Sequence, residues 1–239
     1  MHQQIRPGTG IYVRTDAARL IGVAPSRLRR WVDGYTYWPE GSPRTSSRRR
    51  RPPIVRRDLP VIDKSIALSF VELMELRVVK ALLDFDMSLQ AVRSVANVAA
   101  EYFGTEHPLA SKRLYTDGRK AFAAVLGDDR DEPDLVELSR NRVQQVIAGK
   151  VFHPFLAEID FNPKTALAER WWPRGKKVPV VLDPRIAFGA PIVAGTAIRT
   201  STLVRMADEV GAAETADAFD LKMSDVEAAQ DFEQTLQAD

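Results

Sequence analysis

The arginines near the N-terminus are the residues with the clearest chemical potential. Residues 25–32 carry a polar set made of Ser26, Arg27, Arg29 and Arg30. A guanidinium group can hold O6 and N7 of guanine in a bidentate fork, and a serine near a helix start suits a phosphate. A second run follows at Arg48, Arg49, Arg50 and Arg51. These residues predict an interface with nucleic acid, with Arg27 and Arg30 at bases, although such a cluster can also be a solvated helix face.

Charge is divided unevenly along the chain, although the net charge is only +2. Residues 1–57 contain 13 arginines and no lysine against three acids, whereas residues 207–239 contain ten acids and one lysine. A basic end suits a polyanion, and an acidic end suits a basic partner or simply aids solubility.

No constellation typical of an enzyme is present in the sequence. The chain has no cysteine, and none of its three histidines (His2, His107 and His153) has a partner at metal-ligand spacing. The glycine turns at 8–10 and 195–196 lack the spacing and lysine of a phosphate-binding loop. We therefore expect a protein with no catalytic activity, no metal and no cofactor.

The sequence gives no reason to expect a membrane span or an export signal. No apolar run approaches the roughly 18 residues that a membrane span needs, and residues 1–10 lack the apolar stretch of a signal peptide. A cytoplasmic protein is expected, with no membrane partner.

Two short helices are predicted to carry the first arginine set. Thr15 is expected to cap a helix that Gly22 ends, and Pro25 opens a second helix that runs to Val32. This order of helix, glycine turn and helix matches a helix-turn-helix, whose second helix enters the major groove. The following aromatics, Tyr35 and Tyr37, predict a β wing with an arginine-rich tip. The expected DNA-binding residues are Thr15, Ser26, Arg27, Arg29, Arg30, Tyr35, Tyr37, Arg48, Arg49, Arg50 and Arg51.

The remaining pattern is mostly helical. Apolar periodicity predicts helices over 69–86 and 88–103, and the Asp117-Gly118 pair predicts a hairpin between Leu114 and Val125. The acidic stretch 127–134 marks a boundary between a region at 1–126 and a C-terminal domain at 135–239. Within that domain we expect a helix at 135–147, strands at 151–159 and 178–182, and helices at 201–210, 213–219 and 224–236, the last capped by Ser224.

The predicted fold class is mainly α, with an N-terminal winged helix-turn-helix and its small β wing, central helices, and a small C-terminal helical domain preceded by short strands. The 69–86 helix has an apolar face wider than one neighbouring helix would cover, which favours a homodimer. A dimer would place two recognition helices on two half-sites.

The segment from Gly22 to Trp31, with the sequence GVAPSRLRRW, resembles the winged helix of MerR-type regulators. The family pattern is glycine, valine, a small residue and proline, then leucine, arginine and an aromatic residue; here Arg30 takes the usual aromatic position. The resemblance implies a winged helix that binds double-stranded DNA.

A second segment, Val181 to Thr196, resembles a small domain of unknown function that is common in VapB-type antitoxins. It departs from the pattern after Thr196, where Ala197 stands in place of the usual arginine. The resemblance implies an antitoxin that neutralises a PIN-type ribonuclease toxin and represses its own operon by binding operator DNA. The residues expected to bind the toxin are Trp171, Trp172, Phe188, Asp220, Asp225 and Phe232.

Two other functions fit the same sequence. A stand-alone MerR-like transcriptional regulator would sense a small ligand, with Trp171 and Trp172 lining its pocket. These tryptophans can also pack in the core beside the 178–182 strand, and core packing is the favoured interpretation. An architectural DNA-binding protein with little sequence preference is the third possibility.

Overall fold

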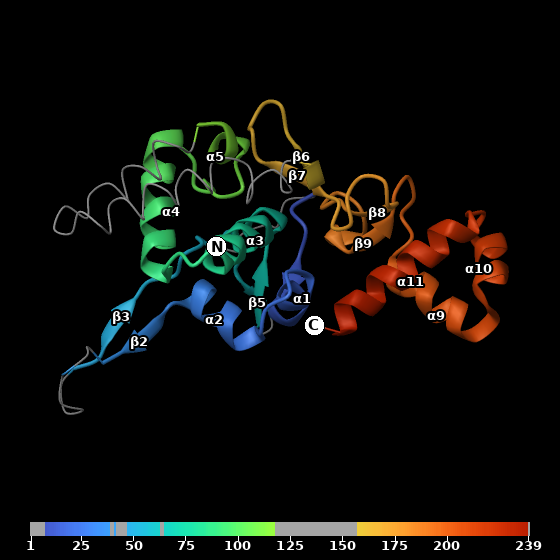
Figure 1. Cartoon of the computed structure of the whole chain (residues 1–239), viewed down its shortest axis with the longest axis horizontal. Coiled ribbons are helices and arrows are strands. Elements are labelled where there is room, and N and C mark those ends of the chain that lie inside the picture. Colours follow the sequence, from blue (N-terminus) through green and yellow to red (C-terminus); the bar gives the residue numbers. More distant parts are fainter. Residues whose placement is uncertain (1–7, 39–40, 42–46, 63–64, 118–156, 239) are drawn as a thin grey trace.

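The computed structural model describes residues 8–38, 41, 47–62, 65–117 and 157–238. Eight α-helices and three small antiparallel sheets lie in this described part (Figure 1), and about half of its residues are helical. The predicted domain boundary at 127–134 and the predicted helix at 135–147 lie outside the described residues.

The first element of the described part is the short strand β1 (Tyr12–Val13), which leads directly into α1 (Arg14–Leu20) and then α2 (Pro25–Asp33). Both helices are where the sequence predicts them, and Gly22 turns the chain between them with φ 64°. The prediction that Thr15 caps the first helix is wrong. Val13 takes the N-cap position because it pairs with Ala67 of the neighbouring strand, and α1 begins immediately after it.

Strands β2 (Tyr35–Tyr37) and β3 (Arg49–Arg51) form an antiparallel hairpin that projects away from the rest of the molecule (Figure 1). Gly34, at φ 71°, joins α2 to this hairpin, and a Cβ there would lie 2.2 Å from the carbonyl oxygen of Arg51. A glycine is therefore required for the close approach. Arg49, Arg50 and Arg51 of the arginine run form the returning strand, and Arg48 precedes it, whereas the prediction assigns the run to the tip.

Two longer helices, α3 (Phe70–Asp84) and α4 (Leu89–Phe103), form the centre. Ser69 and Glu72 form a capping box at the start of α3, and the Ser88 side chain accepts a hydrogen bond from the Ala91 amide. Most of α3 is buried within the chain, with Leu73, Leu76 and Val79 fully covered. The width of its apolar face thus has an intramolecular explanation, and the homodimer stays a prediction.

α1 contacts a sheet in the order β1-β5-β4, which β1 forms with β4 (Val61–Ile62) and β5 (Ser65–Leu68). After α4 the chain forms α5 (Lys112–Asp117), so Leu114 lies in a helix and not in the predicted hairpin. Burial explains this correction, because Leu114 is 2% exposed in the main core. The second half of that predicted hairpin lies outside the described residues.

The C-terminal part combines a four-stranded sheet with three helices. The sheet order follows the sequence, with β6 (Ile159–Phe161), β7 (Ala168–Trp171), β8 (Val180–Leu182) and β9 (Pro191–Val193). A short 3₁₀ turn, Ala187–Gly189, precedes β9. The helices are α9 (Thr200–Val210), α10 (Ala212–Phe219) and α11 (Met223–Ala238), close to the predicted bounds. Ser224 lies inside α11 and does not cap it, because the helix begins one residue earlier.

The N-terminal and C-terminal parts share buried surface. One hydrophobic core includes Leu28 of α2, Leu73 of α3, Trp171 of β7 and Leu182 of β8. A smaller cluster packs Leu20 of α1 against Phe232 of α11. Among the described helices, none has the length and apolar character that crossing a membrane requires.

Candidate nucleic-acid interface

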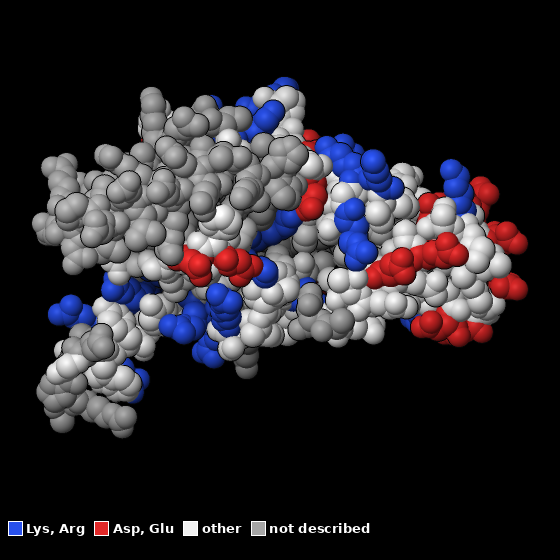
Figure 2. Space-filling model, in the orientation of Figure 1, with Lys and Arg blue, Asp and Glu red and all other residues white. Residues whose placement is uncertain are grey.

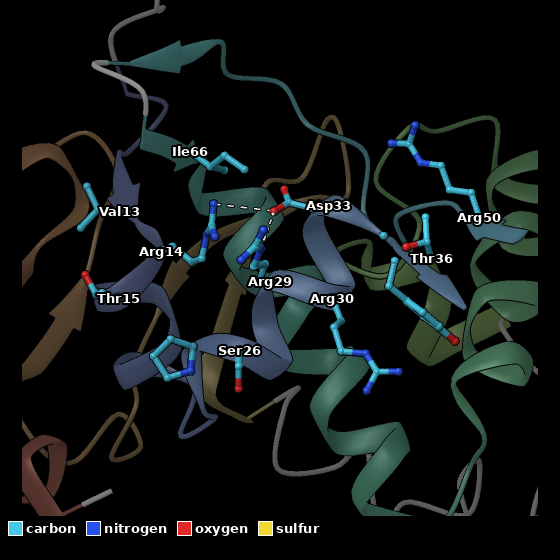
Figure 3. Close-up of a pocket in the computed structure, with 13 residues that line it drawn as sticks. Val13, Arg14, Thr15, Ser26, Arg29, Arg30, Asp33, Thr36, Arg50 and Ile66 are labelled. Carbon is cyan, nitrogen blue, oxygen red and sulfur yellow. Dashed lines mark ion pairs between the residues drawn. The ribbon is translucent and has the colours of Figure 1, made fainter. Parts of the chain in front are cut away.

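A groove of about 990 Å³ runs between α1, α2 and the β2–β3 hairpin (Figure 3). The polar lining side chains of α2 are Ser26, Arg29, Arg30 and Asp33, which share one face because the last three lie three, four and seven positions after Ser26. The start of α1 contributes Arg14 and Thr15, and the hairpin contributes Arg50. Three separate elements therefore bring four arginines to a single concave surface.

Buried residues of α2 explain why this face turns outward. Leu28, Trp31 and Val32 are each at most 2% exposed, so they anchor the opposite side of the helix in the core. The amide of Ile54 donates a 2.8 Å hydrogen bond to the carbonyl of Trp31 and holds the end of the hairpin against α2. The arginines of α2 are left exposed to solvent.

Alternation along the hairpin strands separates its arginines. Arg50 pairs with Thr36 in the ladder, and both line the groove, whereas Arg49 and Arg51 pair with Tyr37 and Tyr35. Tyr35, at the base of the hairpin, also lines the groove, but successive residues of a strand point to opposite faces, so the Arg49 and Arg51 side chains are directed to the face opposite Arg50. The guanidinium of Arg51 lies 5.1 Å from the Tyr37 ring centroid there.

Aromatic rings hold several of the predicted DNA-binding arginines. Arg30 lies 4.4 Å from the ring centroid of Tyr35, and Arg48 lies 4.1 Å from that of Trp38. Such cation–π contacts restrict a long side chain without neutralising its charge. Arg27 is 5.5 Å from the Trp31 ring centroid and does not line the groove, so the structure separates it from Arg29 and Arg30.

Sequence reasoning missed two charged residues of the groove, Arg14 and Asp33. Asp33 forms ion pairs of 3.7 Å with both Arg14 and Arg29 (Figure 3). The i, i+4 spacing of Arg29 and Asp33 is visible in the sequence and could have indicated this pair. Nothing local indicates that Arg14, on a different helix, completes it.

A buried charge cluster fixes the segment that returns from the hairpin. The Asp58 amide donates a 2.9 Å hydrogen bond to Glu72, and the Asp58 carboxylate lies 2.9 Å from Nε2 of His107. The other ring nitrogen of His107 lies 3.0 Å from Glu75. Burial raises the pKa of Glu75, although the hydrogen bond and charge of His107 oppose this. The described residues contain no group of three or more side chains suited to hold a metal ion.

The residues predicted to bind a toxin fall into two groups. Trp171 and Phe232 are 4% and 3% exposed, so both are core residues. The guanidinium carbon of Arg77 lies 4.8 Å from the Trp171 ring centroid, and the ligand pocket suggested for the tryptophan pair stays a prediction. Trp172 is half-buried and donates a 2.9 Å hydrogen bond to Asp160.

Phe188, by contrast, is 69% exposed, Asp220 is exposed, and Asp225 is partly exposed. Figure 2 shows acidic side chains gathered over the end of the molecule that α9, α10 and α11 form. The exposed acids on these elements are Asp208, Glu209, Glu214, Asp217, Asp220, Glu227 and Asp231. The basic groove and this acidic end lie on opposite parts of the molecule (Figures 1 and 2).

The C-terminal part of the chain matches a known protein family. Residues 180–232, from β8 into α11, match the family described as "Protein of unknown function (DUF433)". Over 205 residues, the chain is 25% identical to a Mycobacterium tuberculosis protein named "Putative antitoxin VapB45", covering 84% of each chain. The fold is similar to the crystal structure of Rv2018 from Mycobacterium tuberculosis, with a TM-score of 0.68, 23% identity, and coverage of 95% of this chain and 98% of that one.

Proposed function

We propose that this protein is a non-catalytic antitoxin of a type II toxin–antitoxin system, which binds operator DNA with its N-terminal part and a PIN-type ribonuclease toxin with its C-terminal part. The similarity to VapB45 over 84% of both chains carries the antitoxin assignment. The DUF433 match supports it, because it covers the segment whose sequence resembles that of VapB-type antitoxins.

DNA binding is supported by the arginine-lined groove. In this proposal α2 is the recognition helix of a MerR-like winged helix-turn-helix, and β2–β3 is the wing. Arg29 and Arg30 then face the duplex from α2. Arg50 reaches the duplex from the hairpin, and Arg14 contacts the DNA backbone. A simple solvated helix face would not require arginines from three elements to meet in one concavity.

The acidic end supports the toxin-binding half of the proposal. A ribonuclease must carry a basic surface to bind RNA, and a complementary anionic surface steers association with such a partner. The exposed acids of α9, α10 and α11 supply that surface. Their distance from the groove would let toxin and DNA be bound together.

The DNA-binding half can be tested with the DNA upstream of the gene and a scrambled duplex of the same composition. We expect the wild-type protein to prefer the upstream duplex, and a variant with Arg29→Ala and Arg50→Ala to lose most of its affinity. Arg205→Ala on α9 is the matched control, because Arg205 is exposed and lies outside the groove. Equal binding to both duplexes would instead indicate an architectural protein.

The antitoxin half can be tested by co-expression with the product of the neighbouring gene. We expect a stable complex on co-purification and suppression of RNA cleavage by that product when this protein is added. Absence of both a complex and a toxic neighbour would contradict the antitoxin assignment.

A further inference from the structure

Among the described residues that line the groove, Asp33 is the one with an acidic side chain. It lies between two arginines of different helices, with its carboxylate oxygen 3.7 Å from Arg14 Nη2 and 3.7 Å from Arg29 Nε (Figure 3). The Asp33 and Arg14 side chains are 29% and 28% exposed, and Arg29 is 70% exposed. The carboxylate therefore lies at the edge of solvent, where a DNA phosphate could also approach.

The position of Asp33 is unfavourable for the helix itself. It is the last residue of α2, where the helix dipole is negative and an acidic side chain is disfavoured. The two arginines offset this repulsion. At 3.7 Å these ion pairs are longer than charge-assisted hydrogen bonds, so an incoming phosphate can displace the carboxylate.

We propose that Asp33 acts as an internal competitor for phosphate and limits binding of the groove to non-specific DNA. This inference rests on the proposed DNA binding and adds a specificity-determining residue to it. In the free protein, the carboxylate neutralises part of the charge of Arg14 and Arg29. Any duplex must displace it before these two arginines can contact the DNA backbone.

The cost of displacing Asp33 affects the two kinds of DNA differently. Non-specific binding depends on phosphate contacts, because no base contacts compensate for their loss. Specific binding has base contacts and requires the arginines in one arrangement. Removing Asp33 would free Arg14 and Arg29 for phosphate, but it would also add the cost of ordering them in a specific complex. The net gain should therefore be larger for non-specific DNA.

The test uses the full chain and three variants: Asp33→Asn, Asp16→Asn, and Asp33→Asn combined with Arg29→Gln. Asp16 is the matched control, because it is an exposed acid of α1 that pairs with Arg19 at 3.9 Å outside the groove. Affinity is measured for a duplex that the wild-type protein selects from a random library, and for a scrambled duplex of the same composition, over a series of salt concentrations.

Asp33→Asn is expected to tighten binding to the scrambled duplex by up to about eightfold at 0.1 M salt, since one more phosphate contact steepens the log–log salt slope by about 0.9. Affinity for the selected duplex should rise less, so the specificity ratio falls. Asp16→Asn should leave both affinities unchanged. The double variant should return the scrambled affinity toward that of the wild type, because it removes one charge of each sign.

Two results would overturn the inference. One is a scrambled affinity for Asp33→Asn no higher than that of Asp16→Asn. The other is loss of binding to both duplexes by a variant whose thermal melting is unchanged, which would make Asp33 a positioning residue. If the wild-type protein binds neither duplex and selection does not converge, the proposed DNA binding itself fails. Failure of DNA binding by the wild-type protein is therefore distinguishable from the two results that would overturn the role of Asp33.

Discussion

The Tyr12 hydroxyl donates a 2.7 Å hydrogen bond to the carbonyl oxygen of Gly189, joining the strand before α1 to the turn before β9. Tyr12 is 3% exposed, and its burial, with the charge of Asp183, raises the pKa of the hydroxyl. The group therefore stays protonated and remains a donor. A second bond, from the Ile11 amide to the carbonyl of Phe188 at 2.9 Å, supports the same junction.

Gly189→Ala should be far more damaging than Gly195→Ala, although both glycines have left-handed φ values of 85° and 81°. A Cβ at Gly195 meets open space, whereas one at Gly189 would lie 2.3 Å from the Tyr12 hydroxyl. We expect Gly195→Ala to lower the free energy of unfolding by about 1 kcal/mol because of backbone strain. Gly189→Ala should lower it by about 3 kcal/mol or more, because it also disturbs the packing and the hydrogen bond with Tyr12. Urea denaturation measures both, and equal costs would mean that the junction is not tightly packed.

Arg50→Ala should weaken DNA binding more than Arg49→Ala. Arg50 lines the groove, but its neighbour Arg49 belongs to the opposite face of the hairpin. Loss of one phosphate contact lowers affinity by up to about eightfold at 0.1 M salt, and we expect an effect of about twofold or less for Arg49. Fluorescence anisotropy with a labelled duplex at several salt concentrations measures the difference. Equal losses would indicate that both faces of the hairpin contact DNA.

Local signals were sufficient for the helices that begin and end at capping or turn residues. Pro25 starts α2 as the sequence predicts, and α4, which Ser88 caps and Gly104 ends in the left-handed conformation, lies within the predicted bounds of 88–103. These features depend on a few adjacent residues, and an apolar periodicity of 3.6 then supplies the face that is buried.

Long-range packing explains where sequence reasoning failed. Tyr115 was expected on a strand, but it lies in α5 with its ring 5.8 Å from that of Phe161, a residue 46 positions away. The groove also depends on long-range packing. The helix-turn-helix spacing predicts Arg29 and Arg30, and the arginine run predicts Arg50, whereas the inclusion of Arg14 depends on how β1 pairs with β5 and directs α1. No local signal contains that relationship.

The stability of the protein should fall between about pH 6.5 and pH 9 because of His107. Burial of the ring acts to lower its pKa, but the hydrogen bond and charge of Glu75, together with Asp58, outweigh burial and raise the pKa to about 9. This lies above the unfolded value of about 6.5, so the contribution of protonated His107 is fully present below pH 6.5 and disappears as pH rises through 9. We expect a loss on the order of 1–3 kcal/mol in the free energy of unfolding.

The control for this pH dependence is His107→Gln, which removes the titrating ring. Urea denaturation at half-unit intervals should give a flatter profile for the variant between pH 6.5 and pH 9, even if the variant is less stable throughout. Parallel profiles for the two proteins would assign the pH dependence to other groups.

Phe188→Asn should reduce toxin affinity without reducing stability, if the proposed antitoxin function is correct. Phe188 is 69% exposed and has a left-handed φ of 57°, a conformation that asparagine accepts more readily than phenylalanine. Its ring buries little in the free chain, but an exposed aromatic side chain is a typical anchor of an interface.

We expect the Kd for the co-purifying ribonuclease to rise at least about tenfold, with Tm unchanged or higher. Tyr102→Ala, at a 53% exposed aromatic position on α4 outside the proposed toxin-binding end, is the control and should bind normally. Unchanged affinity of Phe188→Asn beside an intact complex would show that the partner binds elsewhere, and the acids of α9, α10 and α11 would then be the next residues to substitute.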